Sequence, residues 1–363
     1  MKILRITGSY IADEEFGGSV IADYETDNFL RDHGHQVDIF SLSNKNIKNC
    51  KNVTYFRPFF SGNYRFSFYL LFNIYRSLGR YDLIIITGVW DPQALISSYA
   101  LSFTKKKYLI IPHGGLNQST CFKQKKFLKK ILLKVFINRS FKYANKLHYT
   151  NIHEYESSIY KAGDKIISPF PLKNIKYLRK VKNINNYPVN ILFIGRITWK
   201  KGVDLLFKLI EINKTNIFFH ICGSDDEGLL SKWESKLRRE KKILNNYKFH
   251  GFVSGNQKKM IFEQSDIYLL PTYNENFGIA TYEALAYGLP ILISPNTALS
   301  DEIYQFNAGL EISLQAEDVS SKIEILCHDH SKIDLMSRNA QILAKKYRDR
   351  SRKLSLINEY ENI

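Results

Sequence analysis

Short apolar runs separated by helical stretches recur along the whole chain. Several of them are continuously apolar instead of alternating, which is typical of parallel strands covered on both faces. The pattern therefore predicts an α/β fold with two doubly wound, Rossmann-like domains. The runs are residues 2–8, 36–41, 53–56, 83–87, 108–112 and 146–150 in the first half, and 190–195, 216–222, 247–251, 266–271, 290–294 and 309–312 in the second.

The two halves begin alike, because residues 2–8 and residues 190–195 are both apolar runs that end in a glycine. A stretch with three prolines and little apolar periodicity separates them and predicts a linker. The predicted organisation is an N-terminal domain over residues 1–168, a linker over 169–189, a C-terminal domain over 190–340 and a helical tail over 341–363. One prediction is that this tail packs back on the N-terminal domain.

Composition places the chain among globular proteins, since 44% of its 363 residues are hydrophobic and 24% are charged. Its four cysteines lie far apart in the sequence, so neither a zinc knuckle nor a disulfide framework is expected. No leader-type apolar segment and no run of about 20 apolar residues occurs, so we expect neither a signal peptide nor a membrane-spanning helix. The expected location is the cytoplasm.

Positive charge is concentrated in the first half of a chain whose net charge is +17. No acidic residue occurs between Pro92 and His153. Residues 122–143 predict a helix with an apolar stripe beside a basic one. Upstream, residues 55–81 carry eleven Phe or Tyr together with several arginines. The apolar stripe is Leu128, Ile131, Leu132, Val135 and Phe136, and the basic stripe is Lys123, Lys126, Lys130 and Lys134.

Two interpretations of this charge stay open, with a third less favoured. In the first, the apolar stripe packs on the sheet and the lysines form a solvated face. In the second, residues 105–146 adsorb to the anionic inner membrane surface, which makes the protein peripheral on the cytoplasmic face. Nucleic-acid binding is not expected, because no recognised binding motif accompanies the charge.

Two candidate ligand-binding positions follow strands of the first half. Gly17 and Gly18 precede a helical run, and paired glycines let backbone N–H groups approach a phosphate at a helix N-terminus. The alternative is an ordinary turn. His113 follows the apolar run 108–112, where it can hydrogen-bond a substrate hydroxyl. The alternative is a loop histidine without a role.

The second half carries two stronger candidates. Arg196 and Lys201 follow an apolar strand five positions apart and can converge on one diphosphate; otherwise they are a surface pair. Glu275 and Glu283 are eight positions apart, about 12 Å along a helix axis, which suits opposite ends of an extended ligand. The intervening helix start, with the backbone N–H groups of Phe277, Gly278 and Ile279, favours a diphosphate. An ordinary amphipathic helix with exposed glutamates is the alternative.

The Gly195-Arg196 and Lys201-Gly202 pairs and the Glu275-x7-Glu283 pattern resemble the retaining glycosyltransferases of the GT-B fold, family 4 (group 1) type. The resemblance implies an N-terminal domain for the acceptor and a C-terminal domain for a nucleoside diphosphate sugar, facing each other across a cleft. The resemblance implies that Gly17 and Gly18 lie at the donor phosphates, that His113 lies by the transferred sugar, and that Arg196 and Lys201 bind the diphosphate. It implies that Glu275 contacts the sugar, together with the backbone of Phe277, Gly278 and Ile279. It also implies that Glu283 binds the ribose and that Phe252 and Val253 lie beside the base.

The expected function is therefore transfer of a hexose, with retention of configuration, to a glycan or polyprenyl-linked acceptor in bacterial surface polysaccharide synthesis (O-antigen, capsule or exopolysaccharide). No cofactor or metal is expected, because no Asp-x-Asp triplet of the metal-dependent type occurs. A nucleotide-sugar epimerase or sugar phosphorylase on the same fold is one alternative. A non-enzymatic basic protein that binds membranes or nucleic acid is the other. The base, sugar, acceptor and oligomeric state stay open.

Overall fold

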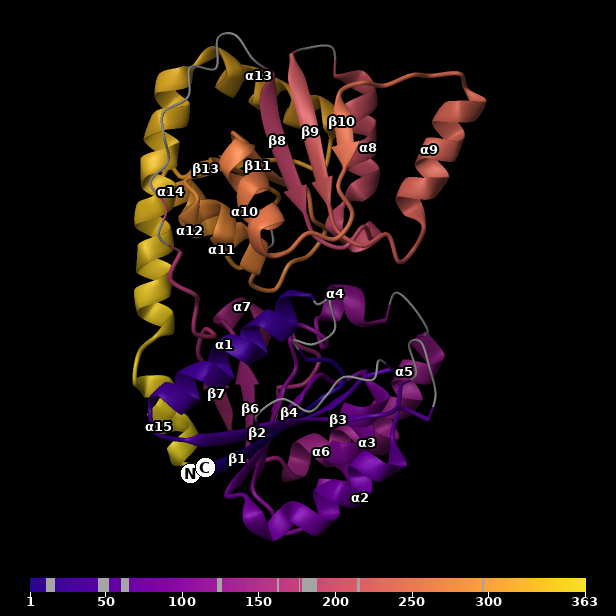
Figure 1. Cartoon of the computed structure of the whole chain (residues 1–363), viewed down its shortest axis with the longest axis vertical. Helices are drawn as coiled ribbons and strands as arrows, with labels where there is room; N and C mark the ends of the chain where they lie inside the picture. The colour runs from indigo at the N-terminus through magenta and orange to yellow at the C-terminus, as the bar shows by residue number, and fades with distance from the viewer. Residues whose placement is uncertain are drawn as a thin grey trace. The chain divides into compact units, whose positions relative to one another are not determined.

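The computed structural model describes residues 1–10, 17–44, 52–59, 65–122, 126–161, 163–175, 177, 188–213, 216–295 and 297–363. The chain divides into two compact units. Unit 1 consists of residues 1–173 and 350–363, and unit 2 consists of residues 174–349. Each unit is an α/β layer structure around its own parallel sheet (Figure 1).

Unit 1 contains a seven-stranded sheet in the order β3-β2-β1-β4-β5-β6-β7, and every neighbouring pair is parallel. The order reverses between β1 and β4, which makes that point the topological switch point of the sheet. The strands are β1 (Lys2–Thr7), β2 (Gln36–Leu42), β3 (Val53–Phe56), β4 (Leu83–Thr87), β5 (Tyr108–Ile111), β6 (Lys146–Tyr149) and β7 (Lys165–Ile167).

Helices cover both faces of this sheet. On one face, α2, α3 and α6 pack against Leu4 and Ile6 of β1 and the matching residues of its neighbours. Arg5 points to the opposite face, where it contacts α1. A local cap starts α3: the Asp91 carboxylate accepts from the Ala94 N–H, and Pro92 occupies the first helical position. The helical elements are α1 (Gly18–Asp32), α2 (Phe68–Ser77), η2 (Leu78–Arg80), α3 (Pro92–Leu101), α4 (Gln118–Cys121), α5 (Lys126–Leu132), η3 (Leu133–Ile137), α6 (Asn138–Tyr143), α7 (Ile152–Glu156) and α15 (Ser355–Glu361).

The last residues of the chain are part of unit 1. The hydroxyl of Tyr360 in α15 lies 2.7 Å from Nδ1 of His148, and Lys146 and Glu359 form an ion pair of 2.6 Å. Leu356 and Ile357 are buried beside them. The C-terminal segment is therefore fixed on the unit that contains the N-terminus (Figure 1).

Unit 2 repeats the architecture with a six-stranded parallel sheet in the order β10-β9-β8-β11-β12-β13. Its apolar core lies between the sheet and α8, α9 and α13. The strands are β8 (Val189–Ile194), β9 (Ile217–Cys222), β10 (Tyr247–Phe249), β11 (Ile267–Leu270), β12 (Ile291–Ile293) and β13 (Gly309–Glu311). The helical elements are η5 (Trp199–Lys201), α8 (Val203–Ile212), α9 (Leu229–Arg239), α10 (Gly255–Gln264), α11 (Ile279–Ala286), α12 (Ser300–Gln305), α13 (Ala316–His328) and α14 (His330–Ser351).

The predicted strands are confirmed, with ends that differ by at most two residues, but β7 (Lys165–Ile167) is not predicted. The predicted helix over residues 122–143 is α5, the π-helical η3 and α6 in succession, with residues 123–125 outside the described part. The expectation that its apolar stripe packs on the sheet is wrong for Leu128, Ile131 and Val135, which are 43% to 48% exposed. Ile137 and Phe141 fill the core instead.

Across the described residues, no helix is both long and apolar enough to cross a bilayer.

Candidate functional site

Two loops meet at the carboxyl edge of the unit 2 sheet because β8 and β11 are adjacent parallel strands. The strand order reverses between them, and such switch points are where open α/β sheets bind ligands. Backbone hydrogen bonds join the loops: Tyr273 N–H and Thr272 Oγ1 both donate to the carbonyl of Lys200, each at 2.9 Å. The loop after β8 is thereby fixed against the loop after β11.

Gly202 makes this close approach possible. It has a left-handed φ of 66°, and a Cβ at this position would lie 1.7 Å from the carbonyl oxygen of Pro271. Any other residue would push the two loops apart. The turn that carries Lys201 therefore depends on glycine in the Lys201-Gly202 pair.

Lys201 and Glu275 form an ion pair between the two loops. Their side chains are 21% and 16% exposed, so both remain within reach of a ligand. Burial raises the pKa of the Glu275 carboxyl, but the Lys201 ammonium outweighs this effect, and the net pKa lies below the ordinary value. Glu275 is therefore an anion at neutral pH, placed as an acceptor for hydroxyl groups.

The N-terminus of α11 lies three residues beyond Glu275. Gly278 forms its N-cap with φ 76°, and no side chain caps the first turn. The free N–H groups of this turn and the positive end of the helix dipole favour a phosphate group. Phe277 is half-buried, with its ring 6.2 Å from that of Tyr347 in α14. The predicted Phe277–Ile279 segment thus occupies the start of the helix beside the ion pair.

Arg196 follows β8 directly and is exposed. Its guanidinium and the Lys201 ammonium are both cations and cannot pair with each other, and Lys201 pairs with Glu275 instead. The structure thus brings Lys201 together with Glu275, and it leaves the Arg196 guanidinium in solvent at the same edge of the sheet.

Glu283 has a partner that nothing in the sequence pattern singles out. Nζ of Lys258, in α10, lies 2.7 Å from Oε2 and 2.8 Å from Oε1 of Glu283. Both side chains are about one-fifth exposed. The predicted ribose carboxylate is therefore held in place by a lysine from the preceding helix, 25 positions earlier in the sequence. The only sequence signal for Lys258 is its place in the first turn of a helix after β10.

Phe252 and Val253 lie in the loop between β10 and α10. Phe252 is half-buried, and Val253 is buried at 5% exposure. Their loop leads directly into the helix that carries Lys258.

In unit 1, His113 lies just after β5 with an unusual left-handed φ of 49°. Its Nε2 is 3.2 Å from Oδ1 of Asp23, and its ring centre is 5.0 Å from that of Phe170. The next residue is braced as well, because the Gly114 N–H donates to the buried Glu154 carboxylate at 2.5 Å. Strained backbone of this kind is concentrated at functional sites. The side chain is 11% exposed, so one edge of the ring is accessible.

A buried charge cluster holds the partner of His113. The fully buried Arg5 guanidinium contacts Asp23 at 2.9 Å and Asp27 at 2.7 Å, and Tyr10 donates to Asp27 at 2.8 Å. Burial raises the pKa of the Asp23 carboxyl, but Arg5 and His113 outweigh it and the net pKa is lowered. No sequence motif singles out this cluster, and the available signal is an arginine inside the apolar strand Lys2–Thr7.

Gly17 and Gly18 begin the helix that carries Asp23. Gly17 is the N-cap of α1, in extended conformation and without a side-chain cap, and Gly18 is the first helical residue. The N-terminus of α1 and His113 are therefore linked through this helix, because its Asp23 contacts the histidine. Gly17, Gly18 and His113, the three predicted residues of unit 1, are connected through α1 in this way. The predicted residues Arg196, Lys201, Glu275 and Glu283 belong to unit 2.

Among the described residues, no group of three or more His, Cys, Asp or Glu side chains could hold a metal ion.

Known proteins resemble the chain over different parts of its length. The profile of the family "Glycosyl transferases group 1" matches residues 174–343. An uncharacterized 41.2 kDa protein in the cps region of Klebsiella pneumoniae is 26% identical over 71% of each chain. The N,N'-diacetylbacillosaminyl-diphospho-undecaprenol alpha-1,3-N-acetylgalactosaminyltransferase of Campylobacter jejuni is 27% identical over 46% of this chain and only 42% of its own length.

Solved structures resemble the whole chain. The Anabaena protein HepE, crystallised with UDP and glucose, aligns over 100% of both chains with a TM-score of 0.77 and 16% sequence identity. A likeness at that identity concerns the fold, which is the GT-B fold of two parallel-sheet α/β domains. Residues 174–343 therefore match the profile of the group 1 glycosyltransferases, and the chain as a whole has the GT-B fold.

Proposed function

We propose that the chain transfers a hexose from a nucleoside diphosphate sugar to a hydroxyl group of a glycan or polyprenyl-linked acceptor, with retention of configuration and without a metal ion. One observation carries the proposal: the partly exposed Lys201–Glu275 pair lies beside the uncapped N-terminus of α11, at the switch point of the unit 2 sheet. This arrangement offers an anion acceptor for sugar hydroxyls next to positive charge for a diphosphate.

The reaction needs stabilisation of the departing diphosphate. The bond between sugar C1 and the diphosphate oxygen breaks, and its electron pair goes to the diphosphate. The acceptor hydroxyl oxygen bonds to C1 on the same face, and its proton passes to the departing oxygen. Lys201, Arg196 and the α11 N–H groups supply fixed positive charge where the negative charge develops. A divalent cation would be redundant in that role.

Each remaining candidate receives a part in the same proposal. Glu283, held by Lys258, binds the ribose hydroxyls, and Phe252 and Val253 lie beside the base. Glu275 and the backbone of residues 277–279 hold the sugar. In unit 1, Gly17 and Gly18 approach the donor phosphates, and His113 contacts the transferred sugar through the exposed edge of its ring.

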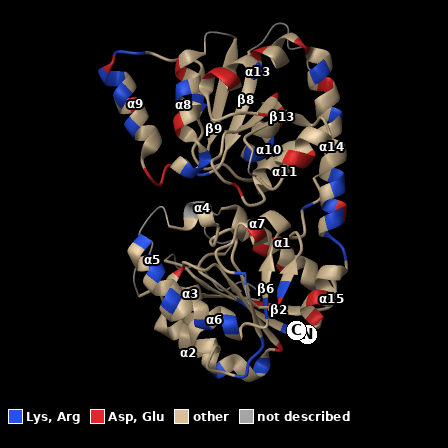
Figure 2. Cartoon of the chain, turned by 180° about the vertical axis from the view of Figure 1, so that it is seen from behind, with Lys and Arg blue, Asp and Glu red and all other residues tan. Residues whose placement is uncertain are grey.

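The proposed setting is surface polysaccharide synthesis at the cytoplasmic face of the inner membrane. It is supported by the cps-region relative and by a relative whose acceptor carries diphospho-undecaprenol. The helix of α5 and η3 adds physical support, because Phe127 and the three apolar residues Leu128, Ile131 and Val135 are exposed. Lys126, Lys130 and Lys134 are exposed beside them, and Figure 2 shows basic residues on α5 and α6. Exposed apolar and basic side chains together favour an anionic bilayer.

Ligand-induced stabilisation tests the donor site directly. The melting temperature is measured with UDP, GDP and ADP, each against its monophosphate, in buffer containing EDTA. We expect one diphosphate at 100 times its dissociation constant to add about 2.7 kcal/mol to the free energy of unfolding, and its monophosphate clearly less. The sugar conjugates of that diphosphate are then offered with a membrane extract as acceptor. If no diphosphate stabilises the protein more than its monophosphate, the proposal is wrong.

A further inference from the structure

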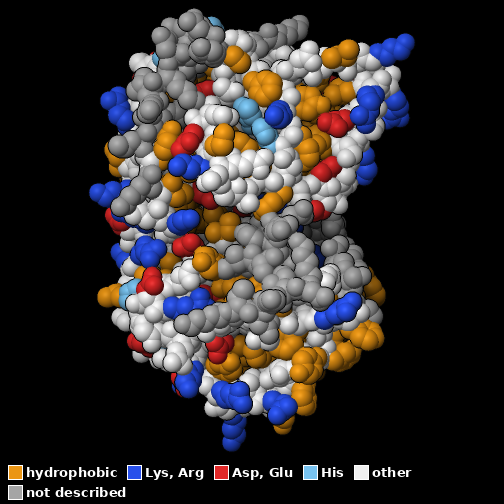
Figure 3. Space-filling view, in the orientation of Figure 1, with side chains coloured by type: hydrophobic (Ala, Val, Ile, Leu, Met, Phe, Trp, Pro, Cys, Tyr) orange, Lys and Arg blue, Asp and Glu red, His pale blue; other side chains and the backbone are white. Residues whose placement is uncertain are grey.

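The outer side of α2 in unit 1 carries an unusual row of exposed aromatic rings. Leu70 and Ile74 face the core, while Phe68, Tyr69, Phe72 and Tyr75 face away from it and are 54% to 73% exposed. Phe59 joins the row, with its ring 6.2 Å from that of Phe68. Figure 3 shows hydrophobic side chains gathered over this end of unit 1. Contiguous exposed apolar surface of this kind marks an interaction site.

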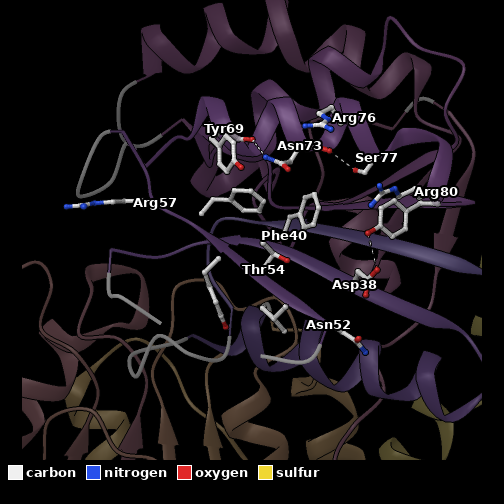
Figure 4. A pocket seen from close by; sticks show the side chains of 14 residues that line it. Asp38, Phe40, Asn52, Thr54, Arg57, Tyr69, Asn73, Arg76, Ser77 and Arg80 are labelled. Atoms are coloured by element: carbon white, nitrogen blue, oxygen red, sulfur yellow. Dashed lines mark hydrogen bonds between the residues drawn. The ribbon is translucent and has the colours of Figure 1, made fainter. Parts of the chain in front are cut away.

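A groove of about 850 Å³ runs beside this row, between α2 and the edge strand β3. Phe40 and Thr54 come from the strands, and Tyr69 and Asn73 come from α2 (Figure 4). The ring of Phe56 lies 5.8 Å from that of Tyr69, so aromatic faces line the groove. The groove is far larger than a single inorganic anion.

Three arginines surround the groove. Arg57 lies at one end and extends away from the rings, while Arg76 and Arg80 lie along the α2 side (Figure 4). In the described part of the chain, no carboxylate forms an ion pair with any of them. The lining includes one acidic residue, Asp38, whose carboxylate accepts a hydrogen bond of 3.0 Å from the Tyr81 hydroxyl. The groove therefore has an excess of positive charge at its exposed rim.

The aromatic row and the α5–η3 surface lie on the same side of unit 1. Both α2 and the η3–α6 segment pack on the same face of the sheet, with α3 between them, so their exposed sides point outward from that face. At the end of α3, the exposed Phe103 lies under the Arg139 guanidinium, 3.8 Å from the ring centre. One planar partner could contact the aromatic row, the α5–η3 surface and Phe103 together.

We propose that the groove between α2 and β3 binds the phosphate headgroup of an anionic phospholipid. Arg76 and Arg80 hold the phosphate, and the rings of Phe68, Phe72 and Tyr75 enter the interfacial region of the bilayer. Arginine recognises phosphate through its planar fork. Tyrosine favours the membrane interface, and exposed phenylalanine rings enter the boundary between headgroups and acyl chains. A free anion would need the arginines only, and a neutral membrane would need the rings only. The proposal rests on the proposed function for its membrane setting alone.

Paired variants with equal charge separate this groove from general electrostatic attraction. The double variant Arg76→Gln and Arg80→Gln is compared with Arg238→Gln and Arg239→Gln, which removes two charges from α9 in unit 2. Binding is measured by co-sedimentation with phosphatidylcholine vesicles, with and without phosphatidylglycerol. We expect the groove variant to bind the anionic vesicles about thirtyfold more weakly than the wild type, and the α9 variant to lose less than about threefold. Equal losses in the two variants would overturn the proposal.

Soluble ligands distinguish the other occupants of the groove. Short-chain phosphatidylglycerol below its micelle concentration, inorganic phosphate and hyaluronate oligosaccharides are titrated by calorimetry. We expect only the short-chain lipid to bind, and to bind the Arg76→Gln and Arg80→Gln variant at least tenfold more weakly. Binding of the oligosaccharide or of phosphate as tight as that of the lipid would contradict the assignment to a phospholipid.

A third variant tests the rings, and a control separates the two proposals. Phe72→Ser with Tyr75→Ser should weaken vesicle binding while leaving the affinity for the soluble lipid within about twofold, since the arginines are intact. The stabilisation by nucleoside diphosphate should be the same in every variant, because these residues lie outside the donor site. If the protein binds the nucleoside diphosphate but not the lipid, only the proposal for the groove is wrong. If it binds the lipid but not the nucleoside diphosphate, only the proposed function is wrong.

Discussion

Unit 1 and unit 2 share a parallel-sheet topology, but the charged side chains that hold their candidate sites differ in exposure to solvent. In unit 1, Arg5, Asp23 and Asp27 are at most 1% exposed. In unit 2, the Lys201–Glu275 and Lys258–Glu283 pairs are each about one-fifth exposed. The first arrangement is inaccessible to a ligand, whereas the second can exchange one partner for a ligand group.

This difference follows from where the residues lie along the strands. Arg5 is in the middle of β1, so its charge is buried under α1 and requires carboxylates from that helix. Lys201 and Glu275 come after the strands end, in loops at the edge of the sheet. A buried charge cluster therefore positions His113 through Asp23, while the partly exposed Lys201–Glu275 pair beyond the strand ends is available for binding.

The largest expected effect concerns the buried cluster. Asp27→Ala leaves the fully buried Arg5 with one carboxylate fewer, and we expect it to lower the free energy of unfolding by about 3–5 kcal/mol. Urea denaturation measures this. Glu283→Gln, which breaks a partly exposed pair, should cost less than about 1 kcal/mol in the same assay. Similar losses for both variants would remove the distinction between the two units.

The next effect concerns catalysis. Lys201→Ala and Glu275→Ala should each lower sugar transfer at least ~100-fold, because each removes a preorganised charge from the reacting groups. Far-ultraviolet circular dichroism and urea denaturation should stay close to those of the wild type. The matched control is Lys208→Ala, which breaks the exposed Lys208–Glu317 pair and should leave transfer unchanged. Near-normal turnover by both site variants would refute the proposed donor site.

The smallest effect concerns a buried histidine of unit 1. Burial lowers the pKa of His148 to about 4, and its ring nitrogens contact the Tyr360 hydroxyl and the Ser168 carbonyl. The unfolded chain takes up a proton below its ordinary pKa of about 6.5, whereas the folded state does so only near 4. Stability therefore falls as the pH decreases through this window.

Between pH 7 and pH 5, this histidine should account for a loss of about 2 kcal/mol in the free energy of unfolding. Urea midpoints at both pH values measure the loss in the wild type and in His148→Gln, which has no titrating ring. The pH-dependent loss should be clearly smaller in the variant. An identical dependence in the two proteins would mean that His148 is already protonated or accessible in the fold.

The positions of the site residues along the chain were predictable, but their partners were not. Arg196, Lys201 and Glu275 follow apolar runs, and the carboxyl ends of parallel strands are where such residues gather. Glu283 is predicted from its helical spacing to Glu275. Lys258 and Asp23 were not predictable, because they lie inside helices with no local pattern that sets them apart from other helical charges. Their importance comes from residues 25 and 90 positions away.

The exposed stripe of α5 and η3 illustrates the same limit for packing. A helical apolar stripe predicts a buried face, but periodicity does not say which of two sides meets the sheet. The structure buries Ile137 and Phe141 and exposes Leu128, Ile131 and Val135. Likewise, β7 contains only two apolar residues, Ile166 and Ile167, and buries only Ile166, so no apolar run marks this strand in the sequence.

By itself, the sequence determined the parallel α/β architecture and the strand ends that carry the candidate chemistry, since both follow from local apolar runs and glycine turns. Only the tertiary structure decided which charges meet. Strand order brings the loop after β8 to the loop after β11, although Lys201 and Glu275 are 74 positions apart in the sequence. Contacts over such distances depend on the pairing of whole strands, which no local pattern contains.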